Sequence, residues 1–133
     1  MNGDDEMLRV VMWIVAGLVI LFAGTALLDA PGRKAGERLQ IGKVDFSKLE
    51  DGVYEGQHKG GRWSNKVRVT VASGTVTGIE VVRDVWLPKP ELTKQVVGDV
   101  IASQSLEVDI VSGATVTTRA YLKAMENALT EAR

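Results

Sequence analysis

The segment from Asp109 to Thr118 carries an unusual concentration of hydroxyl side chains near the end of the chain. It reads DIVSGATVTT and contains one serine and three threonines. The next residues, RAYLKAMENALTEAR, place apolar side chains at helical spacing and predict an amphipathic helix that begins near Val116. A helix cap requires one hydroxyl. The additional hydroxyl groups therefore indicate either residues that stabilise a turn or a site of covalent attachment.

The residue types alone leave two interpretations of this segment open. In the first, Gly113 permits an unusual backbone angle, and Thr115 or Thr117 caps the helix by accepting from its free N–H groups. In the second, those N–H groups and the positive end of the helix dipole hold an anion, for which a phosphate is well suited. A hydroxyl at that position can also be esterified.

Other candidate catalytic groups are sparse. His58 lies in the glycine-rich stretch GQHKGG, where it is either an exposed loop histidine or a general base. That stretch also lacks the spacing of a phosphate-binding P-loop. Glu50 and Asp51 are adjacent, which is typical of a turn rather than of an acid–base pair. The side chains alone do not identify an enzyme.

Composition excludes several classes of site. The chain of 133 residues has no cysteine, so it has no disulfide, no cysteine-ligated iron–sulfur cluster and no c-type haem attachment. A single histidine argues against a structural zinc site. The net charge of -1, without a pattern of basic and aromatic residues, gives no reason to expect nucleic acid as a partner.

An apolar run from Val10 to Leu28 predicts one transmembrane helix. Its nineteen residues carry no charge, and a helix of that length spans about 28 Å, close to the hydrocarbon thickness of a bilayer. A cleaved signal peptide and a buried core helix are the alternatives, but the run exceeds a usual signal-peptide core and Pro31 disfavours cleavage nearby. We therefore expect an uncleaved anchor in the lipid bilayer.

The charges that flank this run favour a cytoplasmic C-terminal domain. Arg9 is the one basic residue before the run, whereas several follow it, at Arg33, Lys34, Arg38 and Lys43. Under the positive-inside rule the more basic flank stays in the cytoplasm. This conflicts with the location that the resemblance below implies.

The remaining pattern predicts an α+β domain. Short strands are expected near 53–55, 66–72 and 75–84, with Ser73-Gly74 closing a β-hairpin and the glycines at 56, 60 and 61 forming a flexible connection. Helices are expected over 90–104 and at the C-terminus. Two helices packed on a small antiparallel sheet, preceded by one transmembrane helix, are the natural arrangement. The expected parts are a tail (1–9), the anchor (10–28), a tether (29–49) and a domain (50–133).

The segment 109–115 resembles the D-x-x-S-G-A-T signature of the small FMN-binding domain. This domain occurs in the flavin-carrying subunits of Rnf and Na⁺-translocating NADH:quinone oxidoreductase complexes and in many bacterial proteins with a single anchor. Upstream, LEDGVYEGQ and KVRVTVASGTVTGIEVV are similar to the family's opening strands. The resemblance covers about residues 50–130.

The resemblance implies a role for each signature residue. The final threonine, Thr115, would receive FMN through a phosphoester bond made by a flavin transferase. Asp109 would belong to the pattern that the transferase recognises. Ser112, Gly113 and Ala114 would shape the turn around the phosphate, leaving Thr117 or Thr118 to cap the helix.

One stretch departs from the family pattern. Many members carry an ETP-type segment after the second hairpin strand, whereas this chain has RDVWLPKPEL. Trp86 and Leu87 stand where a cover for the flavin ring is expected. An aromatic side chain there either stacks on the ring or serves in ordinary packing.

The resemblance implies a membrane-anchored flavoprotein that relays electrons through covalent FMN. Its partners would be the flavin transferase and a membrane redox partner or quinone-linked donor, with the domain outside the cytoplasm. It would be an electron-transfer flavoprotein or a subunit of an oxidoreductase complex rather than a stand-alone enzyme. The alternative is a non-catalytic anchored module that binds FMN non-covalently or acts as a scaffold subunit.

Overall fold

A computed structural model describes residues 3–110 and 113–132, without the side chains of residues 22–32. The chain divides into two compact units, Met1–Lys34 and Ala35–Arg133. Helix α1 (Gly3–Glu37) contains the predicted anchor and continues through the first part of the predicted tether. Within the described part of the chain, no helix combines the length and the apolar character needed to span a membrane.

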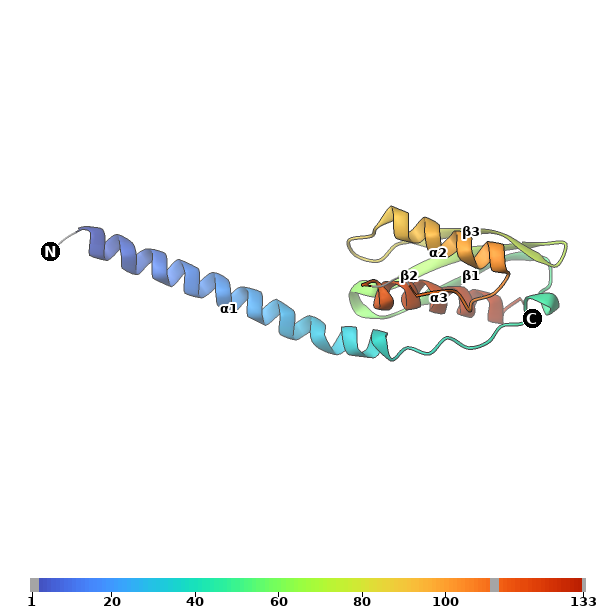
Figure 1. The fold of residues 1–133 in the computed structure, drawn as a ribbon, viewed down its shortest axis with the longest axis horizontal. Coiled ribbons are helices and arrows are strands. Elements are labelled where there is room, and N and C mark those ends of the chain that lie inside the picture. The colour runs from blue at the N-terminus through green and yellow to red at the C-terminus, as the bar shows by residue number, and fades with distance from the viewer. Residues whose placement is uncertain (1–2, 111–112, 133) are drawn as a thin grey trace. The chain divides into compact units, whose positions relative to one another are not determined.

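The second unit is an α+β domain, as predicted (Figure 1). Its described elements follow one another as η1 (Phe46–Lys48), β1 (Gly52–His58), η2 (Gly61–Trp63), β2 (Asn65–Ala72), β3 (Thr75–Arg83), α2 (Pro90–Ser103) and α3 (Thr115–Thr130). The three strands form an antiparallel sheet in the order β1-β2-β3. Residues of the sheet and of both helices share one buried core.

The predicted hairpin between β2 and β3 is confirmed. Val67, Val69 and Val71 are buried in alternation along β2, which is the pattern of a strand with one face on the core. Ser73 and Gly74 both have positive φ, of 53° and 72°, and connect the strands by the tight turn that such hairpins favour.

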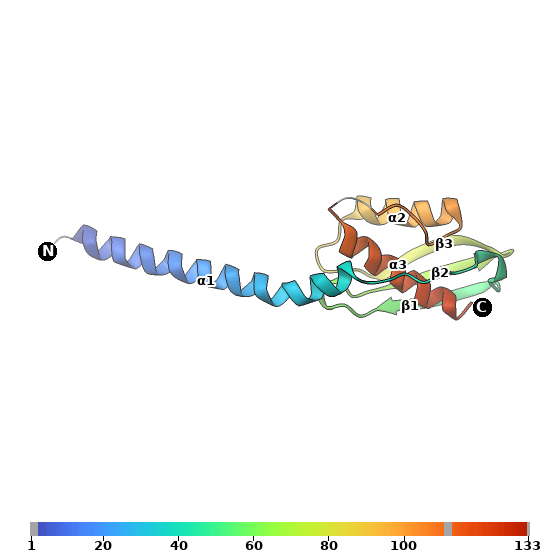
Figure 2. The same ribbon diagram turned by 60° about the horizontal axis from the view of Figure 1, so that its bottom comes forward.

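Helices α2 and α3 cover the same face of the sheet and begin at the same end of it (Figures 1 and 2). The closest approach is at Gly56, where an added Cβ would lie 2.2 Å from both Ala124 O and Ala128 N of α3. The sequence placed Gly56 in a flexible connection, and this prediction was wrong. The glycine instead lets β1 contact the backbone of α3.

Residues 36–49, which the sequence assigned to a tether, pack on the domain. Phe46 and Leu49 are buried in the core. Gly36, in the last turn of α1, approaches so closely to Val116 that an added Cβ would lie 2.4 Å from its Cγ1. Residues 39–45 have no helical or strand period to recognise, so the packing of this segment was not visible in the sequence.

Candidate functional site

The hydroxyl-rich segment leads directly into α3. Gly113 has a φ of +81°, the left-handed conformation that favours glycine. Ala114 is the N-cap residue, and Thr115 is the first residue of the helix and is half-buried. The glycine therefore turns the chain so that a hydroxyl lies in the first turn of α3.

The predicted threonine cap is wrong. The N-cap side chain is the methyl group of Ala114, which cannot accept a hydrogen bond, and α3 has no side-chain cap at this position. Thr117 and Thr118 lie inside the first turn, where they cannot serve as N-caps. Thr118 N already donates to Ala114 O (2.9 Å), as in any α-helix.

The helix start therefore offers N–H groups and a partial positive charge to an anion. The first N–H groups of an α-helix have no partner within the helix, and here the N-cap side chain supplies no acceptor. Thr118 Oγ1 and Arg119 Nε are buried polar atoms without a hydrogen-bond partner in the described part of the chain. The N–H groups of the first turn of α3 fit a phosphate.

The other signature residues are placed as follows. Asp109 lies on an exposed loop before α3. Ser112 lies outside the described residues, so its predicted part in the turn stays a prediction. The carboxylate of Asp109 is accessible to a protein that approaches from solvent.

Trp86 and Leu87 belong to the connection between β3 and α2. The ribbon of this connection lies at the end of the sheet where both helices begin (Figure 2). Their side chains are 67% and 71% exposed. Leu87 has a φ of 55°, an uncommon angle for a side chain of its size. Trp86 N donates to Arg62 O (2.8 Å), which attaches this connection to η2. Exposure favours contact with a ligand or partner over ordinary core packing.

A partly buried hydrogen-bond network joins α3, α2 and the residue after β3. The Tyr121 hydroxyl of α3 donates to Asp84 Oδ1, and Thr93 Oγ1 of α2 donates to Tyr121 Oη (3.2 Å). Burial, followed by the hydrogen bond to Asp84, raises the pKa of Tyr121 to about 12. The neutral phenol therefore joins α3 to α2 and to the end of β3.

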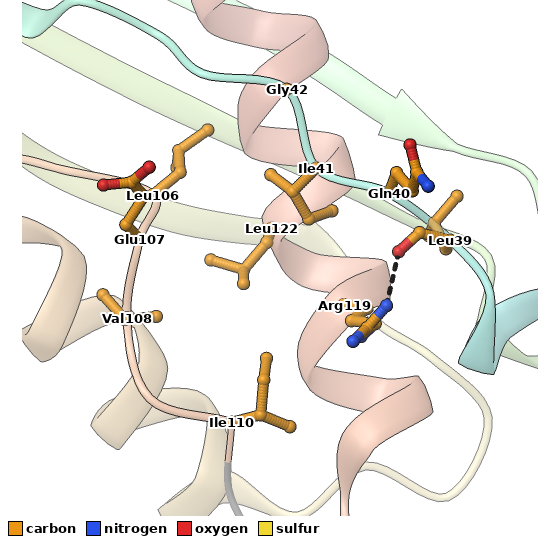
Figure 3. A pocket seen from close by; sticks show the side chains of 10 residues that line it. All are labelled: Leu39, Gln40, Ile41, Gly42, Leu106, Glu107, Val108, Ile110, Arg119 and Leu122. Carbon is orange, nitrogen blue, oxygen red and sulfur yellow. Dashed lines mark hydrogen bonds between the residues drawn. The ribbon is translucent and has the colours of Figure 1, made fainter.

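A groove on the outer surface of α3 was not foreseen from the sequence (Figure 3). It has a volume of ≈350 Å³ and lies between residues 39–42 and residues 106–110. Arg119 lies in its wall, where Nη1 donates to Glu37 O (3.1 Å) and Leu39 O (2.8 Å). The position of Arg119 four residues after Thr115 was the available signal, since residues with this spacing share a helix face.

The structure also describes the surroundings of Asp51 and His58, which the sequence offered as candidate catalytic groups. Asp51 accepts from Ser73 N (3.0 Å) and Gly74 N (2.9 Å), so its carboxylate holds the hairpin turn, as its turn-like position suggested. His58 ends β1 and is half-buried rather than fully exposed. Burial and then the charge of Lys123 lower the pKa of His58.

Comparison with known proteins decides the family. A family model for the FMN-binding domain matches residues 61–130, more than half of the chain. The chain belongs to the FMN-binding domain family. The chain is also 31% identical over 94 residues to an uncharacterized protein of Treponema pallidum (strain Nichols), an alignment that covers 69% of this chain and 26% of that protein. The chain thus matches about a quarter of that relative's length.

FMN is the cofactor of this FMN-binding domain, and the protein is a flavin-binding protein. The matched residues begin in η2 and end with α3, so they include the hairpin, α2 and the whole signature segment. The start of α3, where the N-cap Ala114 makes no side-chain hydrogen bond, presents N–H groups of the kind that bind a phosphate.

Proposed function

We propose that this protein is a membrane-anchored flavoprotein that holds FMN covalently on Thr115 and relays electrons between a membrane donor and another redox carrier. The observation that carries the proposal is the start of α3. Thr115 is the first helical residue, and its N-cap neighbour Ala114 has no acceptor. A phosphate esterified to Thr115 therefore meets the N–H groups of the first turn, which have no partner within the helix, and the positive end of the helix dipole.

Formation of the ester requires an activated donor, because the phosphate of FMN carries no good leaving group. A flavin dinucleotide meets this requirement. A bond forms between Thr115 Oγ1 and the flavin phosphorus while the phosphoanhydride bond of the dinucleotide breaks. The nucleoside monophosphate leaves, and the hydroxyl proton passes to a base of the flavin transferase. No electrons are transferred in this step.

The neighbouring residues have separate roles in this proposal. The positive φ of Gly113 presents Thr115 to the transferase. The exposed carboxylate of Asp109 is available for recognition by the same enzyme. The exposed side chains of Trp86 and Leu87, at the same end of the sheet, are the ring contacts that the sequence suggests.

FMN, once bound, supplies one- and two-electron redox chemistry. The chain holds this group and, through the apolar run 10–28, keeps it at a membrane, where tethering raises its effective concentration for partners in the same plane. We place the domain outside the cytoplasm, where covalent attachment prevents loss of a cofactor that cannot be replaced. The flanking basic residues oppose this orientation, but long domains often translocate regardless of such charges.

Flavin fluorescence after denaturing electrophoresis tests the attachment. The full chain, produced together with a flavin transferase, is expected to give a fluorescent band, and Thr115→Ala is expected to abolish it. Thr117→Ala, two residues further along α3, is the matched control and should stay fluorescent. Flavin that dissociates on denaturation would contradict the ester and favour the non-covalent module. Flavin retained by Thr115→Ala would show that a different residue is esterified.

A protease added to intact cells tests the orientation. Digestion of the domain from outside is the expected result, with a cytoplasmic protein as the control for cell integrity. A domain protected in intact cells and digested after lysis would overturn the extracytoplasmic placement.

A further inference from the structure

Residues 36–49, called the strap below, follow α3 along its length and in the same direction (Figures 1 and 2). Residues of one face of α3 meet the strap in chain order: Val116 at Gly36, Arg119 at Glu37 and Leu39, Lys123 at Gln40, and Glu126 at Gly42. Directly after the strap, Glu50 N donates to Ala132 O (2.8 Å), beyond the last turn of α3. The strap is thus held from the first turn of α3 to its C-terminal end.

The strap determines at which end of α3 the chain enters the domain. Gly36 lies against Val116, the neighbour of Thr115, whereas Glu50 lies beside Ala132 at the other end. These ends are about 24 Å apart, since α3 has 16 residues. A strap that hung free would leave the entry point beside Ala132. The docked strap instead puts it beside Thr115.

A short stretch of chain separates this entry point from the apolar run. Residues 29–35 lie between Leu28 and Gly36. A chain spans at most about 3.5 Å per residue, so Leu28 and Gly36 are at most about 28 Å apart for any course of these residues, whereas a free tether over 29–49 would reach about 75 Å. With the run in a bilayer, as proposed, the start of α3 is therefore confined to the neighbourhood of the bilayer surface.

Two connections lie at the same end of the domain as the start of α3 (Figure 2). Residues 59–64 join β1 to β2, and residues 84–89 join β3 to α2. Asn65 Nδ2 donates to Ala120 O (3.1 Å), which attaches the start of β2 to the second turn of α3. The two connections and the entry point of the chain therefore share one end of the domain.

The side chains of these connections suit the headgroup region of a bilayer. Trp86 and Leu87 lie largely in solvent. Tryptophan is enriched at membrane–water interfaces, because its ring is apolar and its N–H group is polar. The same connections carry the exposed basic residues Lys59, Arg62 and Lys89, which are of the type that lipid phosphates attract.

The acidic residues near the two ends favour the same orientation. Asp84, the one acidic residue of the two connections, already accepts hydrogen bonds from Tyr121 and from Val85 N. The opposite end of the domain carries exposed carboxylates at Asp45, Glu50 and Asp51. Lipid phosphates would repel that end and attract the end with the basic residues.

We propose that the end of the domain formed by residues 59–64 and 84–89 contacts the bilayer surface, with Trp86 and Leu87 in the headgroup region. The inference rests on the membrane anchor of the proposed function but not on the ester. It assigns Trp86 and Leu87 to lipid in place of the flavin ring that the sequence suggested. It also holds Thr115 at the membrane side of the domain, so a donor in the bilayer reaches the flavin there.

Spin labels on single cysteines test this contact, because the chain has no cysteine of its own. The full chain is reconstituted in vesicles of phosphatidylcholine and phosphatidylglycerol, with a nitroxide on Leu87→Cys. Thr75→Cys, at an exposed residue after the hairpin turn at the other end of the sheet, is the matched control. Paramagnetic resonance measures the collision rates of each label with oxygen, which concentrates in lipid, and with a water-soluble nickel chelate.

The ratio of the oxygen rate to the nickel rate should be severalfold higher at Leu87→Cys than at Thr75→Cys. Equal ratios, or a higher ratio at Thr75→Cys, would overturn the proposal. Lys89→Cys is the second position if Leu87→Cys does not fold, since the Lys89 side chain makes no hydrogen bond at the start of α2. It is held to the same comparison.

Arg119→Met, combined with Leu87→Cys, tests the part of the strap. Loss of the hydrogen bonds from Arg119 to the strap should lower the ratio at Leu87→Cys severalfold toward that of Thr75→Cys. Arg68→Met, on the exposed face of the sheet, should leave the ratio unchanged. A ratio that stays high in Arg119→Met would overturn the claim that the strap orients the domain.

Alkaline washing of the same vesicles separates this proposal from the proposed function. A chain that the wash releases refutes the anchor itself. A chain that resists the wash but gives equal ratios at the two ends refutes only the contact of residues 59–64 and 84–89 with lipid.

Discussion

Gly56 of β1 lies directly against the backbone of Ala128 in α3. An added Cβ would lie 2.2 Å from Ala128 N and 2.8 Å from its Cα. Backbone atoms cannot move aside as the end of a flexible side chain can. This contact therefore sets the distance between the sheet and the helix that begins with Thr115.

Gly56→Ala is expected to lower the free energy of unfolding by about 1–3 kcal/mol, because the methyl group overpacks the interface between the sheet and α3. Urea unfolding of the full chain, followed by circular dichroism, measures the change. The control is Gly78→Ala in β3, where the nearest atoms to an added Cβ lie 3.9 Å away on Thr70. Equal loss of stability in both variants would contradict the close packing at Gly56.

Asp51→Ala is expected to destabilise the β2–β3 hairpin by about 1 kcal/mol, since the carboxylate accepts from the amides of Ser73 and Gly74. Amide hydrogen exchange at these two residues should become faster. Glu50→Ala removes the neighbouring carboxylate and serves as the control. Unchanged exchange at Ser73 and Gly74 in Asp51→Ala would show that the turn is stable without the Asp51 carboxylate.

Tyr121→Phe is expected to change how stability depends on pH. The pKa of Tyr121 is raised from 10.0 to about 12, so the folded protein keeps a proton that the unfolded chain loses. The corresponding stabilisation is complete below pH 10 and is lost as pH rises toward 12. Unfolding midpoints in urea at about pH 8 and about pH 11 should therefore differ less in Tyr121→Phe than in the parent.

Tyr54→Phe removes a second tyrosine hydroxyl, which donates to Glu50 O (2.9 Å), and is the control for the loss of a hydrogen bond as such. The same loss of stability at high pH in the parent and in Tyr121→Phe would show that other groups cause it.

Arg119→Met is expected to release residues 37–42 from α3. The guanidinium donates to Glu37 O and Leu39 O, and these hydrogen bonds contribute about 1–2 kcal/mol. Trypsin should then cleave after Arg38 severalfold faster, as measured by mass spectrometry of timed digests. Arg68→Met, which removes an arginine from the exposed Glu55–Arg68–Glu80 ion pairs, is the control. A cleavage rate that does not change in Arg119→Met would contradict this role.

Local pattern was sufficient for the elements of the domain. Alternation along β2, the turn residues Ser73 and Gly74, and the apolar spacing in α3 each predicted the observed structure. Each of these patterns involves residues that are close together in the chain, so it can be read without knowledge of distant contacts. The signature at residues 109–115 could be recognised for the same reason, and it indicated the family and the cofactor.

Long-range contacts decided what local pattern could not. Gly56 was predicted in a flexible connection because a glycine cluster is typical of loops, yet α3 approaches it across the core. The threonine cap was predicted because hydroxyls favour that position, yet the helix begins one residue after Ala114. A shift of one or two residues at a helix start is below what propensity resolves.

The sequence by itself determined the α+β class, the hairpin and the FMN-binding signature, because each depends on residues that are neighbours in the chain. Only the tertiary structure decided that residues 36–49 pack on the domain and that they line one groove together with Arg119, Leu122 and the loop 106–110. Gly36 and Leu122, at the two ends of this set, are more than sixty positions apart in the sequence. The segments meet because burial of one shared core brings them to the same helix, and no local period records that meeting.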